Sequence, residues 1–175
     1  MERAEKGFSL VESMLVIGIA AILMGVLVPN LTGFIKNSRR NGAAEQIAGD
    51  ARKARARAIT TGWQYRVYGF NAGASSAYRN MYRIIGRSSS GVAWPADSAA
   101  PAVTATLNIG PWVNMAKLYP GVSLNPSDGT DHFWVGFDSR GVRFEIDPSF
   151  DPLYVTNQGQ VSSMTVSAVG SVDIQ

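Results

Sequence analysis

The residues with the clearest chemical role lie at the start of the chain. Gly7 and Phe8 join a short charged leader to an apolar stretch, in which Glu12 is the only charged residue as far as Val28. A carboxylate is costly in hydrocarbon, so Glu12 needs a position near an interface or a cationic partner. If the chain is cut after Gly7, the new amino group of Phe8 lies one helical turn from Glu12 on the same face. This spacing predicts a pairing, either within one chain or between staggered neighbours.

Elsewhere the sequence offers few catalytic groups. His132 is the only histidine and there is no cysteine, which excludes a two-histidine metal site and a cysteine nucleophile. The serines at 88–90 lack the Gly-x-Ser-x-Gly pattern, and no phosphate-binding loop is present. We therefore expect no enzyme, no catalytic residue, no metal and no cofactor. In its strand pattern His132 is interpreted as a surface or strand-edge residue.

The segment 125–130 allows two interpretations. Asp128, Asp131 and the carbonyls of this segment offer the oxygen ligands that a hard cation such as calcium takes. Asn-Pro-Ser-Asp-Gly is also an ordinary turn sequence, and the turn is the favoured interpretation.

One long helix must position Glu12. The run from Phe8 to Val28 holds twenty-one residues, which at ~1.5 Å per residue reach about 31 Å, the thickness of a bilayer core. The apolar run is longer than that of a secretory signal, and no clean Ala-x-Ala site follows it. The sequence predicts a membrane-spanning half over residues 8–28.

The helix is predicted to continue over residues 29–60 as an amphipathic half. Pro29 removes a backbone donor and should bend it. Pro29 and the nearby glycines either allow partial unwinding or let membrane helices approach closely, and both alternatives stay open. Small apolar residues recur with helical spacing and predict a stripe that lies close against a sheet: Ala44, Ile47, Ala51, Ala54 and Ala58. Gly62 is a plausible stop for a helix that runs to about Ile59.

From residue 63 to 175 the pattern predicts a globular head rich in strands. Period-two alternation indicates strands over 64–70 and 78–86, and a Ser/Ala/Gly/Pro-rich loop over 88–101 that carries Trp94 as an exposed contact candidate. Strands 132–137 and 142–147 flank a turn at 138–141 and form a hairpin. A later strand runs through Met164, Val166 and Ala168, and Gly170 breaks it. Apart from the strand at 78–86 and the loop at 88–101, residues 71–130 show no recognisable pattern.

The segment Lys6-Gly7-Phe8-Ser9-Leu10-Val11-Glu12 resembles the cleavage and methylation site of type IV prepilins and of type II secretion pseudopilins. The resemblance implies that a prepilin peptidase removes residues 1–7 as a leader by cutting between Gly7 and Phe8. It also implies that the amino group of Phe8 is then methylated. Glu12 would guide assembly by meeting the Phe8 amine of an adjacent subunit.

Further segments resemble the GspH/FimT group of minor pilins and pseudopilins, and more closely its type IV pilus branch, which includes FimU and FimT. These segments are residues 28–31, 54–59, 137–141 and 164–170. The resemblance implies an α+β protein with a type IV pilin-like fold. In that fold a long N-terminal helix, part transmembrane and part amphipathic, packs on an antiparallel β-sheet head.

Basic residues concentrate on the second half of the helix. Residues 36–57 hold seven lysines and arginines against Glu45 and Asp50, although the net charge of the whole chain is only +3. The candidates for a phosphate or partner contact are Arg52, Lys53, Arg55 and Arg57. A DNA-binding minor pilin for DNA uptake is therefore an alternative. The segment 155–175 has no lysine or arginine, and this disfavours nucleic acid as the partner.

The favoured hypothesis is a minor pilin that initiates or caps assembly of a type IV pilus, and the further alternative is a type II secretion pseudopilin. The implied location is the bacterial inner membrane, crossed once, with a periplasmic head, followed by an extracellular or periplasmic filament. The implied partners are other minor and major pilins, the prepilin peptidase and the inner-membrane assembly platform. Assembly through unlike surfaces would generate an open filament.

Overall fold

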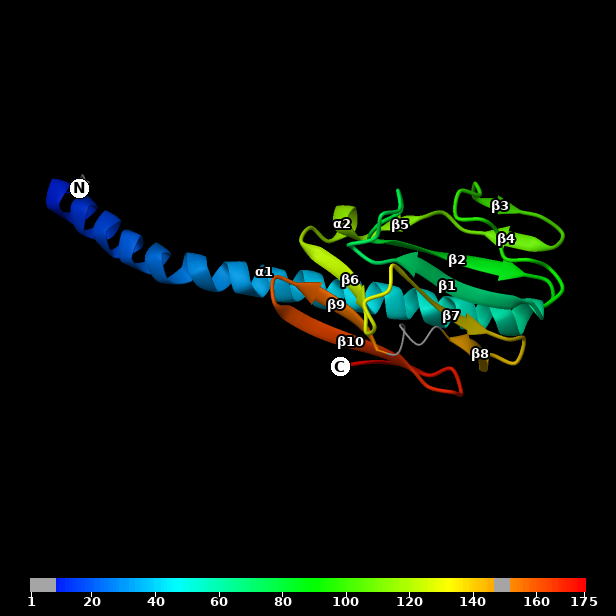
Figure 1. Ribbon diagram of the computed structural model, residues 1–175. Helices are drawn as coiled ribbons and strands as arrows, with labels where there is room; N and C mark the ends of the chain where they lie inside the picture. The colour runs from blue at the N-terminus through cyan, green and yellow to red at the C-terminus, as the bar shows by residue number, and fades with distance from the viewer. Residues whose placement is uncertain (1–8, 147–151) are drawn as a thin grey trace, which may run out of the picture. The chain divides into compact units, whose positions relative to one another are not determined.

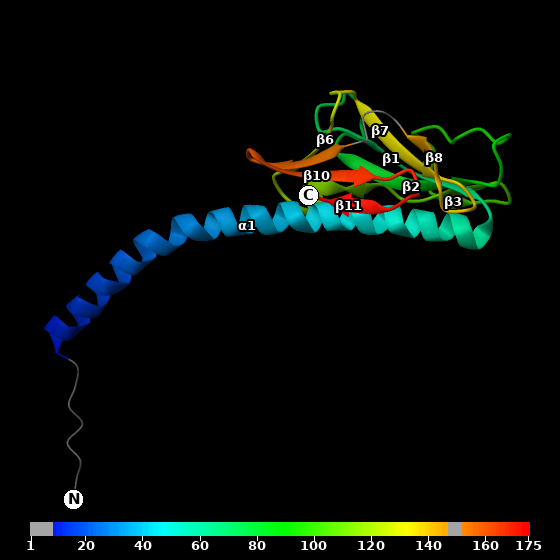
Figure 2. The same cartoon turned by 90° about the horizontal axis from the view of Figure 1, so that it is seen from below.

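The computed structural model describes residues 9–146 and 152–175. The chain divides after Lys36 into two units, Met1–Lys36 and Asn37–Gln175. Helix α1 (Leu10–Thr61) contributes to both and appears in blue to teal in Figures 1 and 2. The long N-terminal helix is therefore confirmed, and its predicted start at Phe8 lies outside the described residues.

Helix α1 ends where the sequence predicts. Gly62 has a φ of +73°, and its N–H donates to the Ala58 carbonyl at 3.0 Å. The Thr61 hydroxyl donates to the Arg57 carbonyl at 2.7 Å, which satisfies another of the last carbonyls of the helix. A left-handed glycine directly after the last turn is a common helix stop because it has no Cβ to clash.

Antiparallel strands form a seven-stranded sheet in the order β3-β4-β2-β1-β7-β8, with β5 paired to β2. Its members are β1 (Gln64–Phe70), β2 (Met81–Arg87), β3 (Ala102–Val103), β4 (Leu107–Ile109), β5 (Val113–Asn114), β7 (His132–Phe137) and β8 (Arg143–Ile146). The bounds of β1 and β7 match the prediction. The predicted hairpin turn is also present, because Asp138 N–H donates to the Val142 carbonyl and Gly141 N–H donates to the Asp138 carbonyl.

A second, four-stranded antiparallel sheet has the order β11-β10-β9-β6. It contains β6 (Val122–Pro126), β9 (Leu153–Asn157), β10 (Gln160–Val166) and β11 (Val172–Ile174), and the short helix α2 (Met115–Leu118) precedes β6. The predicted α+β class, with a helix on antiparallel sheet, is confirmed. The head nevertheless holds two sheets where the sequence predicted one, because β6 and β9 lie where no strand was recognised.

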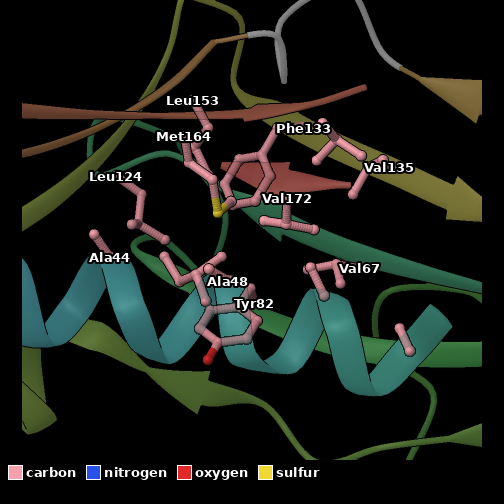
Figure 3. Packing of buried hydrophobic residues seen from close by; sticks show 14 of the residues in the cluster. Ala44, Ala48, Val67, Tyr82, Leu124, Phe133, Val135, Leu153, Met164 and Val172 are labelled. Carbon is pink, nitrogen blue, oxygen red and sulfur yellow. The ribbon is translucent and has the colours of Figure 1, made fainter. Parts of the chain in front are cut away.

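The small-residue stripe of α1 is fully buried as predicted. Seven side chains of this helix have no exposed surface: Ala43, Ala44, Ile47, Ala48, Ala51, Ala54 and Ala58. They share one core with residues of both sheets. Figure 3 shows Ala44 and Ala48 below Leu124, Met164 and Phe133. Since alanine adds little bulk, the helix backbone can approach both sheets closely.

The other face of the seven-stranded sheet carries a smaller core. Its buried members are Tyr68, Phe70, Ala74, Ile85 and Ile109. The loop at 88–101 covers part of this face, and the half-buried ring of Trp94 lies between two guanidinium groups. The Arg66 and Arg87 guanidinium carbons are each 4.2 Å from the Trp94 ring centre. The alternative that Trp94 is an exposed contact point is not supported, because cation–π stacking anchors the ring against β1 and β2.

Two other strand bounds differ from the prediction. β2 begins at Met81 and not at Tyr78, because residues 76–80 form turns and Asn80 has a φ of +56°. β10 ends at Val166, before Ala168, because residues 167–170 form the turn to β11, in which the Gly170 N–H donates to the Ser167 carbonyl at 2.9 Å. Local side-chain and backbone bonds therefore decide where these strands end.

Candidate functional site

The first turn of α1 is capped by Ser9, the second residue after the predicted cleavage site. The Ser9 hydroxyl accepts a hydrogen bond from the Glu12 N–H at 3.4 Å, and the Ser9 carbonyl accepts one from the Ser13 N–H at 3.1 Å. Serine at this position satisfies a helix N–H that has no partner within the helix. Gly7 and Phe8, the predicted cleavage and methylation residues, lie outside the described residues.

Glu12 lies in the first turn of α1, and its side chain is exposed. A negative charge in this position interacts favourably with the positive end of the helix dipole. Glu12 lies three residues after the Ser9 cap, at the N-terminal end of α1. The carboxylate is therefore held at the end of the helix and is accessible to a cation from another molecule.

Around Glu12, large apolar side chains cover α1 on all sides. Ten of them between residues 10 and 24 are exposed: Leu10, Val11, Met14, Leu15, Val16, Ile17, Ile19, Ile22, Leu23 and Met24. Four of them, at 14–17, are consecutive, and at about 100° per residue they surround most of the helix. A helix that is apolar all round requires an apolar environment or a packed partner.

The first half of α1 covers the described part of the predicted membrane span over 8–28. Within the residues that the structure describes, no helix combines the length and hydropathy needed to cross a bilayer. α1 continues without a break through Pro29, where the sequence predicts a bend, but the side chains at 26–30 are not described. The bend at Pro29 stays a prediction.

The four basic residues predicted to contact phosphate or a partner separate into two pairs on opposite flanks of the buried stripe. Arg52 and Arg55 face the head. The Arg52 Nη2 donates to the Val172 carbonyl at 3.0 Å, and the Arg55 Nε donates to the Gly141 carbonyl at 2.8 Å. Arg55 Nη2 also donates to the Val169 carbonyl at 3.0 Å. Arg52 thus fastens α1 to β11, and Arg55 fastens it to the turns that contain Gly141 and Val169.

Lys53 and Arg57 form the second pair, one helical turn apart. They line a hollow that Asp50 and Tyr82 also border. The Tyr82 hydroxyl donates to Asp50 Oδ2 at 2.7 Å, and burial together with this bond raises the pKa of Tyr82 above its usual range. Among the described residues, neither Lys53 nor Arg57 has a side-chain hydrogen bond or ion pair within bonding distance. This pair is therefore the part of the predicted set that can contact a partner.

Asn80 is a structural residue that the sequence did not reveal. Its buried side-chain amide donates to the Val122 carbonyl at 2.8 Å and accepts from the Leu124 N–H at 2.9 Å. Asn80 thereby ties the start of β2 to β6 and occupies what would be a free edge of the four-stranded sheet. Asparagine tolerates a positive φ better than most residues, which is the only sequence signal for this role.

Arg83 and Tyr68 connect the outer face of the seven-stranded sheet to its covering loop. The Arg83 guanidinium is fully buried and donates to the carbonyls of Ala96 and Ala99 at 2.8 and 2.9 Å. Burial lowers the pKa of Arg83, and the nearby Asp97 counteracts this effect. Two causes raise the pKa of Tyr68 to about 12: burial is the larger, and a hydrogen bond to Asp97 adds to it.

The two remaining candidates have structural surroundings. His132 begins β7, is half-buried, and stacks on Trp134 with ring centres 5.4 Å apart. Asp128 forms a turn, in which its Oδ1 accepts the Thr130 N–H at 2.9 Å. No three histidine or acidic side chains gather into a potential metal site within the described part of the chain.

A family profile described as "Prokaryotic N-terminal methylation motif" matches residues 3–28. This match contains the predicted cleavage site and most of the apolar stretch. It confirms the resemblance to type IV prepilins that the segment from Lys6 to Glu12 indicated. A search of curated protein sequences gave no significant match.

Two crystal structures of the type IV minor pilin FimU from Pseudomonas aeruginosa strain PAO1 are similar to this chain. The structure in space group P21 has 12% sequence identity and a TM-score of 0.47, over 81% of this chain and 92% of the FimU chain. The structure in space group P65 also has 12% identity, with a TM-score of 0.43 over 77% and 91% of the respective chains.

Proposed function

We propose that this protein is a minor pilin, made as a prepilin and incorporated into a type IV pilus after its leader is removed. A prepilin peptidase cuts between Gly7 and Phe8, and the new amino group of Phe8 is methylated. The single observation that carries this proposal is the methylation motif over residues 3–28. Within this motif α1 begins after the Ser9 cap and exposes apolar side chains on all sides.

Before assembly, the first half of α1 holds the protein in the bacterial inner membrane and the head lies in the periplasm. The large apolar side chains exposed around the first half of α1 support this location. Lipid or neighbouring helices would remove this apolar surface from water. After extraction by the assembly platform, the same side chains pack against the helices of other subunits in the filament core.

Glu12 directs this packing. Its carboxylate is exposed in the first turn of α1, where the methylated amine of Phe8 from an adjacent subunit can neutralise it. Pairing removes the cost of placing a lone charge in an apolar surrounding. The subunit then initiates or caps the filament together with other minor pilins, and the head faces outward.

The DNA-uptake alternative receives less support from the contacts of the basic pairs. Arg52 and Arg55 already donate to carbonyls of the head, which leaves Lys53 and Arg57 of the four candidate phosphate contacts. A protein that grips DNA commonly neutralises about 6–10 phosphates. The described residues show no feature that favours the type II secretion alternative over the pilus.

The proposal is tested by comparing two variants in cells that make the filament. Gly7→Val should leave an uncut precursor, because the peptidase can no longer accommodate the residue before the cut. Glu12→Ala should be cut normally but should fall strongly in the sheared filament fraction, measured by immunoblot. Glu45→Ala, which removes an exposed carboxylate from the second half of α1, is the matched control. Normal assembly of Glu12→Ala would contradict the pairing, and normal cutting of Gly7→Val would contradict the assigned leader.

A further inference from the structure

A hollow of about 140 Å³ opens in the second unit between α1 and the part of the seven-stranded sheet that contains β2 and β5. Its sheet side is formed by Tyr82 and Ile84 of β2 and by Val113 of β5, which pairs with Tyr82. Gly110 also lines the hollow, and its N–H donates to the Ile84 carbonyl at 2.9 Å. A Cβ at Gly110 would meet that carbonyl oxygen at 2.7 Å, so the backbone there lies directly against β2.

The rim of this hollow carries two cations that are not neutralised. Lys53 is exposed and Arg57 is half-buried, and the two side chains lie on the same flank of α1. Asp50 is the carboxylate that lines the hollow, and its Oδ2 already accepts hydrogen bonds from the Tyr82 hydroxyl at 2.7 Å and from Gln46 Nε2 at 3.2 Å. The donors of Lys53 and Arg57 are thus available to an anion from outside the chain.

The interior of the hollow favours an apolar group beside that anion. Ile84 and Val113 are partly buried and pack against the main core, and the exposed ring of Pro111 forms one side of the entrance. An apolar cavity of about 150 Å³ is large enough to hold benzene. The hollow therefore has room for about one aromatic or branched aliphatic side chain.

These features favour a protein segment over nucleic acid. Only two cationic side chains are available at the hollow, whereas a protein that grips DNA commonly neutralises about 6–10 phosphates. An apolar side chain next to a glutamate or aspartate matches both the apolar interior and the positive rim. The ligand chemistry that fits is an acidic segment of another protein.

We infer that this Lys53–Arg57 hollow docks an acidic segment from another subunit of the filament. An apolar side chain of that segment enters between Ile84 and Val113, and an adjacent carboxylate pairs with Lys53 and Arg57. The identity of the partner as a filament subunit rests on the proposed function, whereas the chemistry of the segment rests on the hollow alone.

The test uses the full-length protein in the cells that make the filament. A photo-crosslinking benzoylphenylalanine replaces Pro111, which is exposed at the hollow, or Lys117, which is exposed on α2, as the positional control. Mass spectrometry then identifies the trapped peptide. We expect position 111, and not 117, to trap a segment of another filament subunit in which an aspartate or glutamate adjoins an apolar residue.

Charge-reversal variants test whether the cross-link at position 111 depends on Lys53 and Arg57. Lys53→Glu with Arg57→Glu should lower the yield at position 111 at least about tenfold, which corresponds to a loss of about 1.4 kcal/mol of binding. Lys117→Glu, with the same kind of charge change on α2, should leave the yield unchanged. Changing the partner's trapped carboxylate to lysine should restore the yield of the doubly reversed variant, which a misfolded variant would not allow.

Several outcomes would overturn the inference. These are a cross-link to nucleic acid or lipid, a yield that charge reversal does not change, and the absence of any cross-link at position 111 from protein that is cut and present in filaments. If the protein is neither cut nor found in filaments, the proposed function fails instead. In that case a charge-dependent cross-link to an acidic protein segment would still support the hollow as a docking site.

Discussion

The two halves of α1 belong to one helix but have opposite surroundings. In the first unit Ile17 is 68% exposed, whereas in the second unit Ile47 has no exposed surface. Large apolar side chains dominate the first half, and alanines dominate the buried stripe of the second. Small residues suit a helix whose packing partner is supplied by its own chain, because they allow close approach. Large exposed residues indicate that the first half obtains its partner from outside the chain.

The largest expected effect comes from placing a carboxylate in each half. Ile47→Asp should lower the free energy of unfolding of the head by more than about 4 kcal/mol, because a buried charge would have no partner. Ile17→Asp should change that energy by less than about 0.5 kcal/mol, yet reduce recovery in membranes and filaments. Urea unfolding of the full chain in detergent, followed by tryptophan fluorescence, measures the first effect, and fractionation measures the second. Equal destabilisation by both changes would contradict the contrast between the halves.

A smaller effect is expected from adding bulk at equivalent alanines. Ala51→Leu should cost about 1–3 kcal/mol of unfolding free energy, because the added carbons have no space between α1 and the sheets. Ala21→Leu makes the same chemical change at an exposed position of the first half and should leave the unfolding curve of the head unchanged. Thermal unfolding of the two variants side by side checks this. Tolerance of leucine at 51 would show that the stripe is loosely packed.

Alanine substitutions can also compare the contributions of the two flanks of the buried stripe to stability. Arg55→Ala removes charged hydrogen bonds to the Gly141 and Val169 carbonyls and should cost about 1–2 kcal/mol. Arg57→Ala, on the side of the hollow, should cost less than about 0.5 kcal/mol. Chemical denaturation of both variants provides the comparison. If Arg57→Ala proved as costly as Arg55→Ala, Arg57 would have a structural role and only Lys53 would remain as a free cation at the hollow.

The smallest effect concerns pH and the smaller core on the outer face of the sheet. Burial and the hydrogen bond to Asp97 raise the pKa of Tyr68 to about 12, above the value near 10 expected in the unfolded chain. The stabilisation is therefore complete below about pH 10 and is lost as pH rises toward about 12. By linkage alone a shift of this size would change the unfolding free energy by about 2 kcal/mol between about pH 9 and about pH 12. Solvent screening reduces this effect, so wild type should lose about 1 kcal/mol more than Tyr68→Phe. Tyr82 titrates in both proteins, so the difference isolates Tyr68, and identical losses would exclude its contribution.

The features predictable from the sequence were those set by local periodicity and by single strong signals. Gly62 stops α1 because the backbone there needs a positive φ, and strands β1 and β7 follow a clear alternation. The alanine stripe follows from helical spacing alone. The methylation motif was recognised from a short run of residues, and the profile match confirmed it.

The features that were missed depend on contacts between distant segments. β6 pairs with β9, about thirty residues later in the chain, and neither strand stands out locally. Trp94 lies in a segment whose composition is typical of a surface loop, and only the folded sheet brings Arg66 and Arg87 to its ring. Likewise, the separation of the basic residues into Arg52 with Arg55 and Lys53 with Arg57 depends on which flank of α1 meets the head.

The central claim, that this chain is a processed pilin subunit, is tested most directly by the N-terminus of the protein in isolated filaments. Mass spectrometry of that material should find a chain that begins at Phe8 and carries one methyl group on its amino nitrogen. A chain that retains residues 1–7, or that begins at any other residue, would contradict the account.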